Sequence, residues 1–147
     1  AYAAHARQQL KGQPGEESER VERSLAAGDY LAEHLHEAPV IAVVCFQPDA
    51  MAITDADLPR PSVVGGGSVY PAVQNLLLAA RNEGLGCVIT TLLCPDEAEI
   101  KALLGMPENW FTCAHVPLGY PVGSGHGPVR RQNVDQLFYR DRWGESW

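Results

Sequence analysis

The chain has 147 residues and a formal net charge of −7, and 46% of its residues are apolar. This length suffices for one domain with a real core, and the composition argues against wholesale disorder. The acidic balance disfavours nucleic acid and anionic membranes as partners. A local anion site is still possible because four arginines cluster near the end: Arg130, Arg131, Arg140 and Arg142.

The first part of the chain is predicted to be mostly helical. Residues 1–11 are helix-prone and give way to a polar stretch with glycine and proline at 12–20, which predicts a mobile loop. Apolar positions predict one helix, or two short ones, over 21–37, with Gly28 as the interruption. The run VIAVVCF at 40–46 has strand length and no alternation, which predicts a strand buried on both faces.

A long loop and an apolar helix are predicted next. Residues 47–64 contain three prolines among acidic residues and predict a loop, either a plain surface excursion or a part of a substrate mouth. The helix is predicted over 69–83, with Ser68 as N-cap, Pro71 in the first turn and Gly84 as C-cap. Its surface is apolar nearly all round, which is typical of a helix at the centre of a protein or at an interface.

The last part of the chain is predicted to contain two strands, a short helix and an extended end. CVITTLL at 87–93 and the segment 110–121 predict strands, and a short helix beginning after Pro95 ends at Gly105. Residues 134–147 predict a final strand or an extended tail. This order implies helices packed on a sheet within a single domain over 1–147.

The cysteines and histidines give no metal pattern. Three of the four cysteines lie in apolar runs typical of strands, and no C-x-x-C pair occurs among Cys45, Cys87, Cys94 and Cys113. This pattern is typical of reduced thiols in a cytoplasmic protein. Zinc requires closely spaced ligand pairs, and His34 and His36 lie on different faces of a helix, so we predict no metal site. No apolar run reaches the ~20 residues of a membrane helix, and no signal peptide is visible.

The common nucleotide motifs are absent. A G-x-G-x-x-G pattern begun at Gly65 fails because its last glycine position is Tyr70, and neither a Walker lysine nor a G-x-S-x-G elbow occurs. Adjacent Arg130 and Arg131 suit a doubly charged phosphate, although a solvated surface pair is the alternative. Thr90 and Thr91 offer hydrogen-bond donors at a strand end, or simply reflect β-propensity.

Five segments in a fixed order resemble the distal part of the nitroreductase family: GSVYPAVQNLLLAARNEGLG, CVITT, EIKALLGMPENW, AHVPLGYP and RRQNVDQLFYRDRW. The resemblance covers about residues 20–147 and implies an α+β fold, with a mixed sheet flanked by helices. It also implies a homodimer with two FMN sites at the subunit interface. The segment 134–147 would be a strand exchanged with the partner, and the helix 69–83 would lie in the dimer core.

The resemblance further implies the positions of the flavin contacts. The backbone of Ile89, Thr90 and Thr91 would face the isoalloxazine ring, with one N–H reaching N5. Arg130 and Arg131 match basic residues that contact the FMN phosphate. Gln74 and Asn75 match a polar pair of the helix to which no role is assigned. The family's N-terminal Arg-Ser-x-Arg type segment has no counterpart in this sequence, so the chain is expected to begin after it.

The activity implied by the resemblance is hydride transfer from NAD(P)H through FMN to an electron-poor acceptor, such as a nitroaromatic or a quinone. No catalytic side chain is expected, since the flavin carries the chemistry. Two alternatives stay open. One is different flavin chemistry, such as flavin fragmentation or reductive dehalogenation. The other is a flavin or small-molecule binding module without catalysis. The physiological acceptor and the choice between NADH and NADPH are not encoded in any recognisable pattern.

Overall fold

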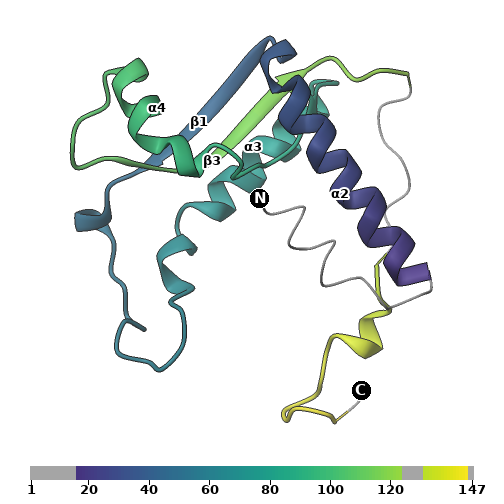
Figure 1. The fold of residues 1–147 in the computed structure, drawn as a ribbon. Helices are drawn as coiled ribbons and strands as arrows, with labels where there is room; N and C mark the ends of the chain where they lie inside the picture. Colours follow the sequence, from purple (N-terminus) through teal and green to yellow (C-terminus); the bar gives the residue numbers. More distant parts are fainter. Residues whose placement is uncertain (1–15, 124–130, 146–147) are drawn as a thin grey trace.

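The computed structural model describes residues 16–123 and 131–145, which fold into helices and a small sheet (Figure 1). This arrangement confirms the α+β class. Short 3₁₀ turns connect several of the elements. The helices and strands are α2 (Glu16–His34), β1 (Val40–Phe46), α3 (Tyr70–Asn82), β2 (Gly86–Cys87), α4 (Glu97–Leu104) and β3 (Phe111–Gly119). Among the described residues, no helix is both long enough and apolar enough to cross a membrane.

The sheet has the strand order β1-β3-β2, so β3 is the central strand. Val40 pairs with Leu118 and Gly86 with Gly119, and both strand pairs are antiparallel. The parallel part of the expected mixed sheet is therefore not among the described residues. A register shift between Val44 and Cys45 interrupts the β1–β3 pairing.

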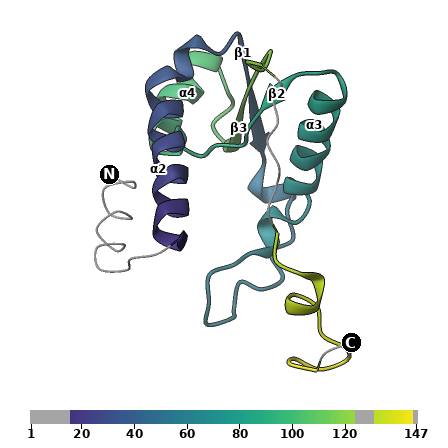
Figure 2. The same ribbon diagram turned by 90° about the vertical axis from the view of Figure 1, so that its right-hand side faces the viewer.

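The helices lie on both faces of the sheet. Figure 2 shows α2 and α4 on one side and α3 on the other. The buried core is centred on β3, where Ala114, His115 and Val116 have no exposed surface, and α3 adds Val73 and Ala80. Most of the other large apolar side chains are half-buried or exposed, and the expectation that β1 is buried on both faces is wrong for this single chain, because its residues are half-buried or exposed.

Helix α2 corrects the predicted mobile loop. Residues 16–20 belong to the helix, since no proline or glycine occurs between Gly15 and Gly28 to stop it. Residues 12–15 lie outside the described part of the chain. The helix continues through Gly28 to His34, where the 3₁₀ turn η1 (Leu35–Glu37) precedes Pro39. The choice between one helix and two is thereby settled in favour of one.

Helix α3 begins differently from the prediction and ends at Asn82, with Glu83 rather than Gly84 as its C-cap. Its N-cap is Val69, whose backbone is already helical, and no side-chain cap is formed, so the assignment of Ser68 is wrong. The 3₁₀ turn η3 (Val64–Gly66) precedes the helix, and the backbone of Gly67 and Val69 is already helical. An N-cap residue normally has an extended backbone, so this approach provides no position for a side-chain cap. Pro71 lies in the first turn, and Gly84 follows the helix with φ of 75°, a conformation that favours glycine.

The predicted strand at 87–93 needs correction, whereas the final strand or extended tail at 134–147 stays a prediction. The predicted strand 87–93 is reduced to β2 and one further bridge between Thr90 and His115. The register places Val88 opposite Pro117, which has no N–H to donate to a ladder. In this single chain, residues 131–145 form turns and the 3₁₀ helix η5 (Val134–Gln136), and none of the described strands pairs with them. The exchange of this segment in a dimer stays a prediction.

Candidate functional site

A groove of about 1190 Å³ runs between α2 and the segment that follows β2. It is lined by residues of α2 between Ser24 and His34, by Glu37 and Ala38, and by Val88–Leu92 with Pro95. Ligand sites in proteins commonly have volumes of about 300–1,000 Å³, and this groove slightly exceeds that range, so it has room for a cofactor or substrate. All three residues that the sequence assigned to the flavin ring, Ile89, Thr90 and Thr91, lie in its lining.

The backbone of this segment is held by a single pair of hydrogen bonds. The N–H of Thr90 donates to the carbonyl of His115, and the N–H of His115 donates to the carbonyl of Thr90, both at 2.9 Å. Hydrogen-bonded and non-hydrogen-bonded residues alternate along an antiparallel strand. Among the described residues, the N–H groups of Ile89 and Thr91 have no hydrogen-bond partner, and alternation about the Thr90 bridge directs them away from β3. Two backbone donors are thus available beside the groove.

The side chain of Thr90 is turned inward. It is 7% exposed, and its Oγ1 accepts a hydrogen bond from the N–H of Leu92 at 3.1 Å, which fixes the turn after the bridge. Ile89 is 39% exposed and Thr91 is also exposed. Thr90 therefore shapes the backbone of the segment, and its two neighbours present their surfaces to the groove and to solvent.

His115 lies behind this segment and was not identified as a site residue from the sequence. It faces Thr90 across the bridge and is fully buried, and neither ring nitrogen has a hydrogen-bond partner among the described residues. Burial lowers the pKa of His115, and the Thr90 backbone and the Glu97 carboxylate oppose this shift without reversing it. His115 is therefore neutral in the folded chain at neutral pH. A lone histidine in a strand gives no sequence signal for this role.

Polar side chains of the groove lie along its rim on the α2 side. The Nδ1 atom of His34 lies 2.8 Å from Oε1 of Glu37, and the imidazole stacks on the ring of Tyr30 with centroids 4.1 Å apart. The hydrogen bond from His34 is the main cause that lowers the pKa of Glu37. No lysine or arginine belongs to the described lining, and its carboxylates are those of Asp29 and Glu37.

Of the two predicted phosphate ligands, the structure describes Arg131 alone, and this residue does not line the groove. Arg131 is exposed, and Arg130 lies outside the described residues. Gln74 and Asn75 are exposed on α3. The assignment of the arginine pair to a phosphate therefore stays a prediction.

The cysteines are free thiols, as predicted. Cys45, Cys87 and Cys113 are half-buried within β1, β2 and β3, and Cys94 is exposed. Burial is the main cause that raises the pKa values of the Cys45 and Cys113 thiols. Within residues 16–123 and 131–145, no group of three or more histidine, cysteine or acidic side chains is arranged to bind a metal ion.

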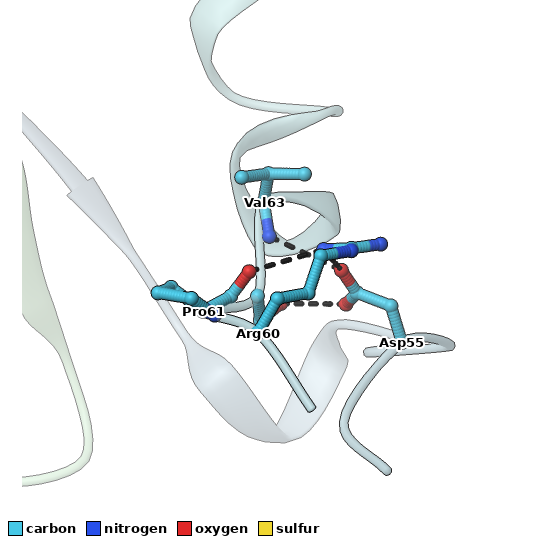
Figure 3. A network of polar contacts seen from close by, with 5 residues as sticks. Asp55, Arg60, Pro61 and Val63 are labelled. Carbon is cyan, nitrogen blue, oxygen red and sulfur yellow. Dashed lines mark hydrogen bonds and ion pairs between the residues drawn. The ribbon is translucent and has the colours of Figure 1, made fainter. Parts of the chain in front are cut away.

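The loop between β1 and α3 is organised by a buried acid (Figure 3). The Asp55 carboxylate accepts hydrogen bonds from Arg60 at 2.7 Å, from the Ser62 hydroxyl at 2.6 Å and from the Val63 N–H at 3.2 Å. These bonds, that from Ser62 most strongly, lower the pKa of Asp55. A smaller pocket of about 200 Å³ lies beside the loop and is lined by Met51, Ile53, Tyr70 and their neighbours.

Comparisons with known proteins identify the family. The model of the nitroreductase family matches residues 1–120. A protein of Archaeoglobus fulgidus with the provisional name NADH dehydrogenase/NAD(P)H nitroreductase is 39% identical over 77 residues, which are 49% of this chain and 43% of that protein. A crystal structure of a protein with the same provisional name from Parabacteroides distasonis is 28% identical, with a TM-score of 0.58 over 76% of this chain and 61% of that one.

A third similarity concerns the fold alone. A variant of the FMN and NADPH-dependent nitroreductase NfnB from Sphigopyxis sp. strain HMH has a TM-score of 0.62 over 95% of this chain and 57% of its own, at 14% identity. The chain thus covers less than two thirds of the length of each of these three proteins. The family match covers most of the chain, and the fold agrees with it. The chain belongs to the nitroreductase family.

Proposed function

We propose that this chain is an FMN-dependent oxidoreductase that transfers hydride from NAD(P)H, through the flavin, to a nitroaromatic, quinone or similar electron-poor acceptor. Membership of the nitroreductase family supports oxidoreduction. The observation that carries the proposal is the pair of backbone N–H groups, at Ile89 and Thr91, that have no partner among the described residues and lie in the lining of a groove of about 1190 Å³. A planar heterocycle with acceptor atoms along its edge matches such an arrangement of donors.

The residues present fit the ring system of FMN. The groove has ample volume, its lining is largely apolar, and the N–H groups of Ile89 and Thr91 have no competing partner in the part of the chain that the structure describes. The phosphate requires positive charge, which the lining lacks, and we assign this role to Arg130 and Arg131. Because Asp29 and Glu37 line the groove, the phosphate is expected to lie away from the α2 rim.

The roles of the chain's own residues follow from this placement. The N–H groups of Ile89 and Thr91 bind and orient the ring edge, and fixed dipoles of this kind stabilise negative charge in a site from which water is excluded. The buried Thr90 holds the two donors at fixed positions through its bonds to His115 and Leu92. The apolar lining excludes water. When bound, FMN supplies the hydride chemistry itself.

A homodimer is part of the proposal. Leu78 on α3 is 55% exposed and Tyr70 is 46% exposed, and the segment after residue 131 exposes Leu137 and Phe138. Apolar surface of this extent is typical of an interface. A partner subunit would cover α3 and would provide strands that pair with the segment 134–147.

A binding module without catalysis is the second candidate. The absence of basic residues from the described lining favours it, because a weakly held phosphate lowers the affinity for FMN. Anaerobic titration of the FMN-loaded protein with NADPH and with NADH distinguishes the two. Bleaching of the flavin absorbance supports the oxidoreductase, whereas bound flavin that neither nucleotide reduces supports the module. Product analysis then separates nitroreduction from dehalogenation or flavin fragmentation.

A further inference from the structure

The groove contains one cluster of titratable side chains, and all of its members come from the α2 side. They are Asp29, Tyr30, His34 and Glu37. The facing residues Val88–Leu92 and Pro95 contribute no titratable side chain. Among these side-chain types, imidazole alone normally changes its charge between pH 5 and 8. His34 is therefore the member of this cluster whose side-chain chemistry suits proton transfer.

The orientation of His34 is fixed from two sides. Its Nδ1 lies 2.8 Å from the Glu37 carboxylate, and its ring stacks on Tyr30 with an interplanar angle of 25°. Because a carboxylate only accepts hydrogen bonds, Nδ1 donates its proton to Glu37. Nε2 is then the ring nitrogen left for a ligand, and it has no hydrogen-bond partner among the described residues. The side chain of His34 is 37% exposed, so it exchanges protons with water.

We propose that His34 donates a proton to the electron acceptor bound in this groove, and that Glu37 and Tyr30 position its ring. The inference rests on the proposed function and adds a catalytic side chain where the sequence predicted none. The donor is the imidazolium form of His34, which carries a proton on each ring nitrogen. The N–H bond at Nε2 breaks as an O–H bond forms on a carbonyl or nitro oxygen of the acceptor, and the neutral ring keeps the Nδ1 proton that it donates to Glu37. The hydride equivalent, with both electrons, comes from the reduced cofactor, and His34 regains its proton from water.

The groove also defines the class of acceptor. The Glu37 carboxylate is hydrogen-bonded to His34, and the described lining contains no lysine or arginine. An uncharged quinone or nitroaromatic is therefore favoured over an acceptor with several negative charges. His36 provides a matched control, because it lies two residues away in η1, is exposed and does not line the groove.

The first test uses two acceptors with the FMN-loaded full chain. Reduction of duroquinone to its hydroquinone requires one proton in addition to the hydride. Ferricyanide, in contrast, accepts electrons without taking up a proton. We expect His34→Gln to slow reoxidation by duroquinone about 10²-fold, the usual contribution of a general acid. Reoxidation by ferricyanide and reduction by NADPH should not change, and His36→Gln should leave all three rates unaffected. An equal loss with both acceptors, or no loss with either, contradicts the proposal.

The second test does not depend on flavin chemistry. The uncharged probe 4-nitrobenzamide is added to the protein while the histidine Cε1–H resonances are followed by NMR. The resonance of His34 should shift with saturation while that of His36 stays in place. A His34 resonance that does not move contradicts the proposal. If the protein takes up no FMN, the proposed function fails, but this titration still shows whether His34 faces a bound acceptor.

Discussion

At the scale of single residues, His115 combines full burial with two ring nitrogens that have no partner among the described residues. An unpaired buried polar group opposes folding, and its protonation opposes folding further. The residue lies directly behind Thr90, which holds the two backbone donors of the groove. The stability of the donor segment is therefore coupled to the protonation of this imidazole.

This coupling predicts a pH-dependent stability. The pKa of His115 is lowered from 6.5 in the folded chain, so the unfolded chain binds more protons as the pH falls through the ordinary range of histidine. Above that range, His115 does not change the free energy of unfolding with pH, and below it the free energy of unfolding decreases as the pH falls. Between pH 7.5 and 5.5 we expect urea unfolding to show a loss of about 1 kcal/mol that His115→Leu removes. Parallel pH profiles for the two proteins would contradict this.

Arg131 carries the prediction for the phosphate. Replacing it with alanine removes a charged donor, and hydrogen bonds to charged groups contribute about 1.5–3 kcal/mol. We expect Arg131→Ala to weaken FMN binding about tenfold or more, measured by quenching of flavin fluorescence. Arg81→Ala, which removes an arginine from the last turn of α3, is the control. An unchanged affinity in Arg131→Ala rules out the phosphate assignment.

The sequence located some of these residues and missed others for a physical reason. Ile89, Thr90 and Thr91 were assigned because the family resemblance places a whole segment at once, and all three line the groove. His34 and His115 carry no pattern of their own. The position of His34 beside Tyr30 and Glu37 depends on the helix α2 and the turn that ends it. The burial of His115 depends on strands far apart in the sequence.

At the scale of elements, two glycines of helices have opposite roles. Gly84 follows α3 with φ of 75°, whereas Gly28 lies inside α2 and a Cβ there would meet nothing within 4 Å. We expect Gly84→Ala to destabilise the chain by about 1–2 kcal/mol, because a left-handed backbone strains any residue with a side chain. Gly28→Ala should stabilise it by about 0.5–1 kcal/mol. Urea unfolding measures both stability changes, and two changes of the same sign would contradict the opposite roles assigned to Gly84 and Gly28.

Elements with local signals were predicted well, and those set by distant partners were not. The strand at 40–46, the end of α3 before Gly84 and the helix ending at Gly105 follow from runs and breakers within a few residues. The strand at 87–93 is shortened because Pro117 lies opposite Val88, and that register is invisible in either segment alone. The start of α3 was misplaced because a 3₁₀ turn, rather than Ser68, leads into it.

At the scale of the whole molecule, a small core accompanies extensive exposed apolar surface. Leu78 of α3 belongs to the surface that we assign to a partner subunit. We expect Leu78→Glu to convert the dimer into monomers, since a buried charge without a partner is costly, and analytical ultracentrifugation measures this directly. Leu103→Glu is the matched control, because Leu103 is 85% exposed on α4, outside that surface. If the Leu78→Glu variant stays dimeric, the assignment of α3 to the interface is contradicted.

The central claim is that the strand edge at Ile89 and Thr91 binds the flavin ring through its backbone. The most direct measurement is an NMR titration of the ¹⁵N-labelled chain with FMN, in which backbone amide resonances are followed residue by residue. The account predicts that the amide protons of Ile89 and Thr91 shift together with the saturation of flavin binding. The amide of Thr90, bonded to His115, should move less. FMN binding that leaves the amides of Ile89 and Thr91 unchanged would contradict the account.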